Sequence, residues 1–184
     1  MKIPVIKLSR EQMRAGIARF SSLQGCDTGL PDMYLPDGLR TFYSVLGFEQ
    51  PSIEGANSPF GATSRPHITG MKPGFGLSYI TCKPGCGALM HAHDTNETFV
   101  VMSGAWEMSW EDEDGVASEV LRPRDVCSFP VGVQRQFMCV EAAPGEADAL
   151  LLAVIAGDAP GAEYSPEVID RMADAGLIDR ANYL

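Results

Sequence analysis

The stretch from Gly85 to Gly104, GCGALMHAHDTNETFVVMSG, constrains the fold of this chain more than any other part of the sequence. It holds two of the three histidines, His91 and His93, which are separated by a single residue. On a β-strand, residues i and i+2 point to the same face of the sheet. A strand here therefore aims both imidazoles at one point, and a turn into a neighbouring strand brings Glu97 to the same point.

The chemistry of these three side chains indicates a metal site. Two imidazoles and one carboxylate are a common ligand set for first-row transition metals, and they leave coordination positions open. His91, His93 and Glu97 are therefore the candidate metal ligands. The third histidine, His67, lies in another part of the chain, and a lone histidine is more typical of a surface or core position than of a ligand.

Residues 68–155 show the patterns of a β-rich domain. Apolar and polar residues alternate from Trp106 to Glu111, as in a strand with one buried face. The acidic run 111–115 ends in Asp-Gly, a strong hairpin signal. The continuous apolar run 149–155 predicts a strand that is buried on both faces. Several short strands with regular turns indicate an all-β sandwich or barrel.

A helix is predicted on each side of the β region. Ser9 and Gln12 have the spacing of a capping box, which predicts a helix over about residues 10–22. Ser165, followed by a proline, predicts the start of a C-terminal helix that ends near Gly176.

A long irregular segment, residues 25–66, is rich in Gly, Pro, Ser and Asp, with one short strand expected over 42–46. Such a segment usually wraps a core or covers a site. We therefore expect three parts: an N-terminal helix and covering segment over 1–66, a barrel over 67–157 and a C-terminal helical extension over 158–184.

The histidine stretch resembles the first sequence motif of the cupin superfamily, G-x5-H-x-H-x3,4-E-x6-G. Gly85, His91, His93, Glu97 and Gly104 satisfy every spacing. The resemblance implies a cupin double-stranded β-helix, a jelly-roll-like barrel with the site in its mouth. It also implies a bound metal, such as iron, manganese, nickel, copper or zinc, and a homodimer, because members of the superfamily are often dimers.

The second cupin motif, G-x5-P-x-G-x2-H-x3-N, is only partly present. Pro130 and Gly132 match it, whereas Arg124, Arg135 and Cys139 stand at its Gly, His and Asn positions. The resemblance therefore implies that an arginine occupies the place of the fourth metal ligand.

Arg135 changes what the site can do. It shares a strand face with the apolar Val133 and Phe137, so we expect it to point into the barrel. A guanidinium cannot ligate a metal, because it has no lone pair to donate and stays protonated. About 5 Å from a divalent metal whose charge is partly cancelled by Glu97, it costs roughly 3 kcal/mol at an effective dielectric constant of about 20.

Three arrangements relieve this repulsion. An anionic substrate bridges the metal and Arg135, or Arg135 turns away towards other acids, or no metal binds and Arg135 pairs bidentately with Glu97.

The favoured hypothesis is a metal-dependent enzyme of the dioxygenase type that acts on a small anionic molecule. Fe(II) is the favoured metal, because two open positions hold substrate and O₂ together, whereas Mn, Ni or Zn would polarise a carbonyl. Arg135 is then the catalytic residue that contacts the substrate. The alternative is a non-catalytic cupin that binds or senses a small molecule with a degenerate or empty metal site. A metal-independent isomerase ranks last, because His91 would have to act as its general base with only a Tyr or Glu to help it.

Composition limits the partners. The formal net charge of −10 and the pI near 4.6 argue against binding to nucleic acid and to anionic membranes. No apolar run is long enough to span a bilayer, and the N-terminus lacks the apolar core of a signal peptide. We therefore expect a cytoplasmic protein whose partner is a small-molecule substrate or ligand. The five cysteines, an odd number, then indicate reduced thiols.

Overall fold

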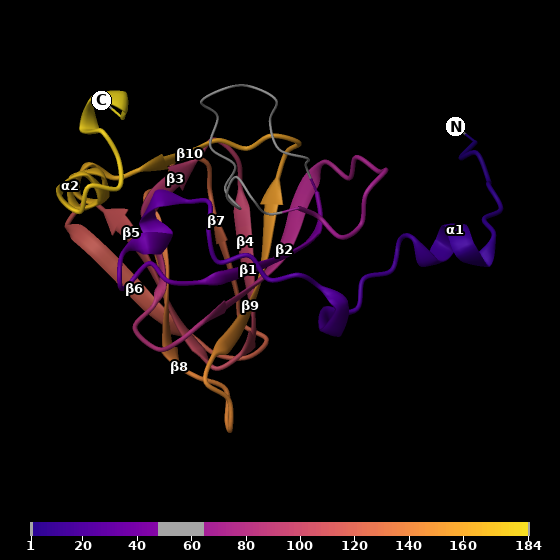
Figure 1. The fold of residues 1–184 in the computed structure, drawn as a ribbon, viewed down its shortest axis with the longest axis horizontal. Helices are drawn as coiled ribbons and strands as arrows, with labels where there is room; N and C mark the ends of the chain where they lie inside the picture. Colours follow the sequence, from indigo (N-terminus) through magenta and orange to yellow (C-terminus); the bar gives the residue numbers. More distant parts are fainter. Residues whose placement is uncertain (1, 48–64, 184) are drawn as a thin grey trace.

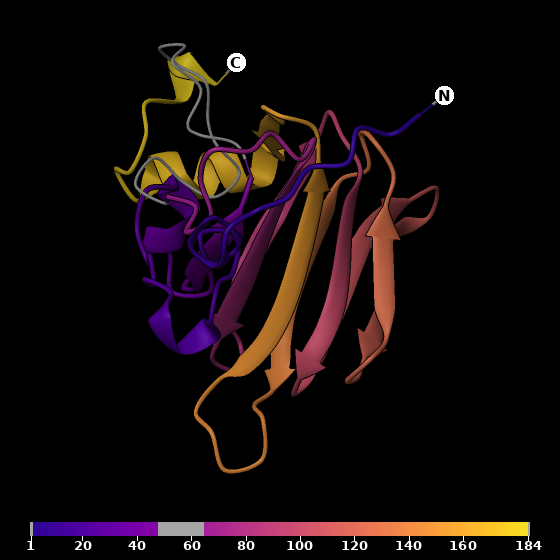
Figure 2. The ribbon, with the colours of Figure 1, turned by 90° about the vertical axis from the view of Figure 1, so that its right-hand side faces the viewer.

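Two five-stranded antiparallel sheets form the body of the protein in its computed structural model, which describes residues 2–47 and 65–183 (Figure 1). The β1–β7 sheet has the order β1 (Thr41–Leu46), β2 (Phe75–Cys82), β9 (Ala149–Ala156), β4 (Glu97–Ser103) and β7 (Val126–Phe129). The β10–β6 sheet has the order β10 (Ala162–Tyr164), β3 (Gly87–His93), β8 (Arg135–Glu141), β5 (Ala105–Asp112) and β6 (Gly115–Leu121). The sheets face each other as the two walls of a barrel (Figure 2), so the all-β prediction is confirmed.

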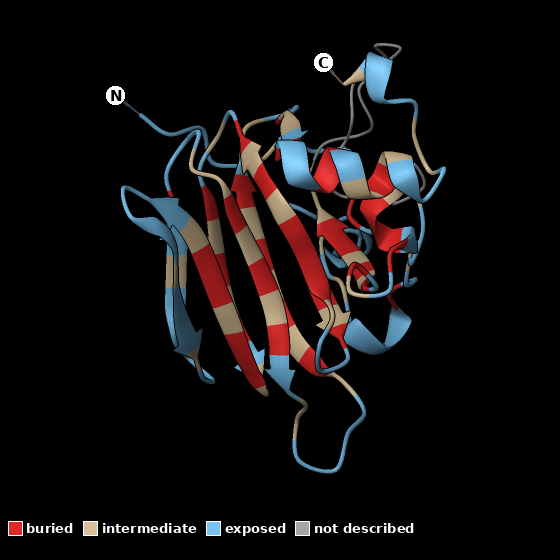
Figure 3. Ribbon diagram, turned by 90° about the vertical axis from the view of Figure 1, so that its left-hand side faces the viewer, coloured by how far each residue is buried: buried red, intermediate tan, exposed pale blue. Residues whose placement is uncertain are grey.

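The core lies between the two sheets. Phe99 from the β1–β7 sheet and Trp106 and Phe137 from the β10–β6 sheet are at most 3% exposed. The ring centroid of Phe137 lies 4.9 Å from that of Phe99 and 5.9 Å from that of Trp106. Buried and half-buried residues alternate along the strands, because successive side chains point to opposite faces (Figure 3). The predicted alternation in β5 holds for Trp106, Glu107 and Met108, but it breaks at the next pair, because Ser109 is buried and Trp110 is only half-buried.

Strand β9 is less buried than its sequence predicts. Leu151 and the other residues that face the opposite sheet are fully buried, but Leu152 and the other inner residues of the strand's second face are half-buried. The prediction of burial on both faces is wrong because the outer face of the β1–β7 sheet is only partly covered. Part of the cover comes from Phe20, whose ring packs edge-on against Tyr79 of β2 at 5.2 Å.

The turns fall where the sequence predicts them. Asp112 of β5 pairs with Gly115 of β6, and Glu113 and Asp114 form the tip of this hairpin. The short strand expected over 42–46 is β1. Cys82, Cys86, Cys127 and Cys139 are free thiols.

The C-terminal helix α2 (Pro166–Asp174) begins and ends as predicted. The Ser165 hydroxyl accepts a hydrogen bond from the backbone N–H of Val168, and Gly176 beyond its end has a φ of +71°. The short 3₁₀ turn η3 (Arg180–Asn182) follows.

The N-terminal helix is much shorter than predicted. α1 (Arg10–Arg14) has the expected capping box between Ser9 and Gln12, but it ends at Arg14, and a separate 3₁₀ turn, η1 (Phe20–Ser22), follows. No residue of α1 is buried, so the helix has no apolar face packed in a core to support a greater length.

The irregular chain around η2 (Pro31–Tyr34) lies against one side of the barrel, in contact with β3 and α2 (Figure 2). The division into three parts stays a prediction, and residues 48–64 of the expected covering segment lie outside the described residues. Within the described ranges, no helix has the length and apolar character needed to cross a membrane.

Candidate metal centre

The three predicted ligands meet at one end of the barrel. His91 and His93 lie on β3, and a tight turn over residues 94–96 leads to Glu97, the first residue of β4 in the opposite sheet. One ligand atom from each residue lies within 4.8 Å of the other two. All three side chains are buried, at 8%, 4% and 4% exposure. The strand alternation therefore places both imidazoles on the inner face, as the His-x-His spacing predicts.

Backbone carbonyls fix the tautomer of each histidine. Nδ1 of His91 lies 2.6 Å from the carbonyl oxygen of Leu89, and Nδ1 of His93 lies 2.6 Å from that of Gly161. A carbonyl oxygen can only accept a hydrogen bond, so Nδ1 carries the proton in both rings. Nε2 of each neutral imidazole then has a free lone pair. Histidines that bind metals are usually oriented in this way.

Burial keeps both histidines neutral. It lowers the pKa of His91 well below its usual value of 6.5, with further contributions from the charges of His93 and Arg135. Burial also lowers the pKa of His93, although the negative charge of Glu97 works in the opposite direction. Nε2 of His93 faces Oε2 of Glu97 at 3.5 Å. Two lone pairs therefore point at each other, an arrangement that a cation between them would stabilise.

Arg135 points into the barrel, as predicted, and is completely buried. It is the first residue of β8, directly opposite His91 on β3. Its Nη2 donates a hydrogen bond to Oε2 of Glu97 at 2.7 Å, whereas its Nε has no hydrogen-bond partner. The guanidinium lies 5.9 Å from the centroid of the Phe129 ring. The ion pair of the third predicted arrangement is thus formed, but through a single hydrogen bond rather than a bidentate pair.

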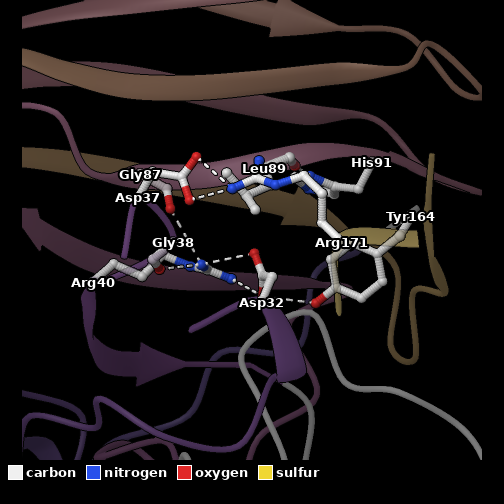
Figure 4. A network of polar contacts seen from close by, with 9 residues as sticks. All are labelled: Asp32, Asp37, Gly38, Arg40, Gly87, Leu89, His91, Tyr164 and Arg171. Carbon is white, nitrogen blue, oxygen red and sulfur yellow. Dashed lines mark hydrogen bonds and ion pairs between the residues drawn. The ribbon is translucent and has the colours of Figure 1, made fainter. Parts of the chain in front are cut away.

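A second buried ion pair, which the sequence did not reveal, lies in the same region (Figure 4). Both carboxylate oxygens of Asp32 lie 2.9 Å from the guanidinium of Arg40, and Oδ1 also accepts a hydrogen bond from the hydroxyl of Tyr164 at 2.7 Å. Burial, and then the negative charge of Asp32, raise the pKa of Tyr164, so its hydroxyl stays protonated and donates. Tyr164 pairs with His91 between β10 and β3, which connects this network to the candidate metal ligands.

No spacing in the sequence identifies this network. Asp32 and Arg40 come from the irregular segment before β1 and meet only because the chain turns back on itself. The sequence gives one indirect indication. Residues 25–66 are predicted to cover the site, which implies that some of their side chains face it.

A small cavity of about 30 Å³ separates the two ion pairs. It is lined by Leu30, Asp32, Arg40, Phe42, Ile80, Ala88, His91, His93, Glu97, Phe137, Ala162 and Tyr164. A volume of this size holds one or two water molecules or a metal ion. Arg135 is not among the lining residues, and it meets the cavity only through Glu97. His67 is exposed and is not part of the ligand group.

Solved structures with the same architecture identify the fold. An oxalate oxidase matches with a TM-score of 0.50 and 14% identity, over 84% of this chain and 72% of that chain. Peruvianin-I, a cysteine peptidase from the latex of Thevetia peruviana, matches with a TM-score of 0.54 and 12% identity, over 89% and 83%. The chain has the cupin fold.

A sugar phosphate isomerase of the cupin superfamily from Silicibacter pomeroyi matches with a TM-score of 0.49 and 20% identity, over 82% of each chain. No protein-family model matches the sequence, and no curated protein matches it. The matched structures include an oxidase and a peptidase, and a fold shared at this level of identity does not transfer an activity.

Backbone conformation explains how the second cupin motif tolerates its changes. Gly132, which matches the motif, has a φ of +77°, and its N–H donates to the carbonyl of His93 at 2.9 Å. Arg124, at the motif's first glycine position, has a φ of +83°, the only positive φ outside glycine in the described chain. The cupin backbone is therefore kept at this turn even though the glycine that suits it is absent.

Proposed function

We propose that the protein is a metal-dependent enzyme of the dioxygenase type that acts on a small anionic molecule. The observation that best supports a metal is the pair of facing lone pairs on Nε2 of His93 and Oε2 of Glu97, 3.5 Å apart in a buried site. His91, His93 and Glu97 would hold the ion, with Fe(II) favoured over Mn, Ni and Zn. A bound Fe(II) would supply redox and Lewis-acid chemistry at its open coordination positions.

The rest of the site suits an anion. Glu97 Oε2 is the acceptor for Arg135, so a metal that takes this oxygen competes with the guanidinium for it. The buried Nε of Arg135 already has no acceptor, and a second unpaired N–H would raise the cost of burial. A substrate carboxylate would satisfy these donors once the side chains between the cavity and Arg135 moved, because Arg135 does not line the cavity itself. Metal and anion should therefore each tighten the binding of the other, because coupling between two sites is reciprocal.

The size of the cavity favours a small substrate. About 30 Å³ accommodates only a few heavy atoms without movement of the covering segment. The apolar side chains of Phe42, Ile80 and Phe137 line the same space and exclude bulk water from it. Small mono- and dicarboxylates are therefore the first compounds to test.

A second candidate function is non-catalytic binding of a small molecule. The observation that supports it is the 2.7 Å ion pair between Arg135 and Glu97, which neutralises the carboxylate without any metal. In that case the cavity would take an anion directly, next to a degenerate ligand set.

One experiment separates the two functions. The protein is reconstituted with Fe(II) in the absence of oxygen, mixed with each carboxylate and then exposed to O₂, and thermal shifts are recorded with and without chelator. The enzyme proposal predicts O₂ consumption with at least one carboxylate and thermal stabilisation that requires metal. Stabilisation by carboxylates in chelator, with no effect of metal and no O₂ consumption, would refute it in favour of the binding protein.

A further inference from the structure

The second buried ion pair satisfies only one of the two carboxylate oxygens of Asp32 within the described chain. Oδ1 accepts two hydrogen bonds, from Nη2 of Arg40 at 2.9 Å and from the hydroxyl of Tyr164 at 2.7 Å. Oδ2 lies 2.9 Å from Nη1 of Arg40, but Nη1 donates instead to the carbonyl oxygens of Gly38 and Gly87, at 2.7 Å and 3.3 Å. Oδ2 is therefore close to the positive charge but accepts no hydrogen bond from the described residues.

The covering segment holds this carboxylate in one orientation. Asp32 lies in η2 and is fully buried, and Arg40 is 6% exposed. A Cβ atom on Gly38 would collide with the backbone carbonyl of Asp32, so the glycine allows the close turn that brings the two charges together. Because Oδ1 already accepts two hydrogen bonds, rotation of the carboxylate would only exchange one unpaired oxygen for the other.

The unpaired oxygen belongs to a side chain that lines the internal cavity. Figure 4 shows Arg40 and Tyr164 converging on Asp32, and all three line the cavity of about 30 Å³. The candidate metal ligands line the same space, and the ring centroids of Tyr164 and His91 lie 6.4 Å apart. A buried acceptor without a donor is costly, and a molecule in the cavity can supply that donor. The arrangement therefore favours an occupant that carries an O–H or N–H group.

The charge of the ion pair selects the kind of donor. Arg40 already balances the negative charge of Asp32, so a cationic ammonium group would add an uncompensated charge to a buried site. A neutral hydroxyl supplies the hydrogen without that charge. We propose that the substrate is a small hydroxycarboxylate whose hydroxyl donates a hydrogen bond to Oδ2 of Asp32. This inference rests on the proposed function, because it leaves the carboxylate of the same molecule for the candidate metal ligands.

The size and polarity of the cavity narrow the class of substrate further. Because the cavity is small, the hydroxyl belongs on the carbon next to the carboxylate or on the one after it. A keto oxygen at the same place would present a lone pair to Oδ2 and leave it unpaired. A hydrogen bond to a charged acceptor is stronger than one to a neutral acceptor, so the hydroxy acid should bind at least about tenfold more tightly than its keto analogue.

The test compares lactate with pyruvate, which share a carbon skeleton and a carboxylate and differ in whether the second oxygen can donate. Isothermal titration calorimetry measures the Kd of each, with each enantiomer of lactate, for the full chain loaded with Zn²⁺, so that no oxidation alters the ligand. We expect one enantiomer of lactate to bind at least about tenfold more tightly than pyruvate. The compound 2-fluoropropionate, which cannot donate, should bind no more tightly than pyruvate.

Asp32→Asn should reverse this preference. The amide oxygen takes the place of Oδ1, where it meets two donors, so the NH₂ group stands where Oδ2 is and offers a donor in place of an acceptor. The variant should therefore bind pyruvate more tightly than lactate. The ratio of two Kd values in one variant does not depend on its folded fraction, so lost stability cannot imitate the reversal. Asp37→Asn is the matched control and should keep the wild-type ratio, because Asp37 pairs with Arg171 and does not line the cavity.

Two results would overturn the inference. One is an equal Kd for lactate and pyruvate in the Zn²⁺-loaded wild type, a comparison that needs no variant. The other is a preference for lactate that Asp32→Asn retains, because the hydroxyl would then contact another group. Wild type that binds no Zn²⁺ would refute the proposed function together with this inference, whereas Zn²⁺-loaded protein without a preference for lactate would refute the hydroxycarboxylate alone.

Discussion

Replacing Arg135 with methionine should strengthen metal binding about 100-fold. Nη2 of Arg135 lies 2.7 Å from the Glu97 oxygen. A metal bound to that oxygen at about 2.1 Å lies within about 5 Å of the guanidinium. At that distance and an effective dielectric constant of about 20, a unit charge and a divalent ion repel each other by roughly 7 kcal/mol.

Only part of the repulsion between Arg135 and the metal appears as a gain in the metal affinity of the variant. The negative charge of Glu97, the ligand that also accepts the hydrogen bond from Arg135, cancels part of the charge of the ion. A net charge of +1 at about 5 Å leaves about 3 kcal/mol, a factor of about 100 in Kd.

Chelator competition with Zn²⁺ and Mn²⁺ at pH 7.5 measures this change in Kd. Arg135→Lys is the matched control, because it keeps the positive charge, and its Kd should stay within a few-fold of the wild-type value. A Kd for Arg135→Met that equals or exceeds that of wild type would show that the arginine does not oppose a metal at this site.

Three further predictions concern stability, measured by urea unfolding of the metal-free protein. Burial lowers the pKa of His91 and His93, so below pH 6.5 the unfolded chain binds more protons than the folded protein. The free energy of unfolding should therefore fall as the pH drops below that value. A rise would contradict neutral imidazoles in the folded protein. Asp32→Asn breaks a fully buried ion pair and should lower the free energy of unfolding by about 3–5 kcal/mol. Asp37→Asn is the control and should lower it by less than about 1 kcal/mol, because its partner Arg171 is more than one-third exposed. Arg124→Gly removes the steric penalty of the positive φ and should raise the free energy of unfolding by about 1 kcal/mol. Arg124→Ala keeps a Cβ atom and should not raise it.

The parts of the fold that depend on local pattern were predictable. The alternation from Trp106 to Met108 in β5, the Asp-Gly turn after this strand and the Ser-Pro start of α2 are each encoded within a few residues. The same holds for His91 and His93, because their spacing on one strand decides that they share a face.

The features that depend on distant contacts were not predictable. Nothing near Arg10 shows that the helix lacks a surface to pack against, so its length was overestimated. The outer face of β9 is apolar in sequence, but only the fold shows that it is half covered. Asp32 and Arg40 form an ion pair across a turn of irregular chain, which no repeat or motif marks.

Metal analysis of the purified protein shows whether His91, His93 and Glu97 hold a metal ion. Wild type and His91→Ala are produced in metal-replete medium, and bound metals are quantified by mass spectrometry after extensive dialysis. We expect about one transition-metal ion per wild-type chain and a large loss in the variant. Wild type without stoichiometric metal, or an unchanged metal content in His91→Ala, would contradict this expectation.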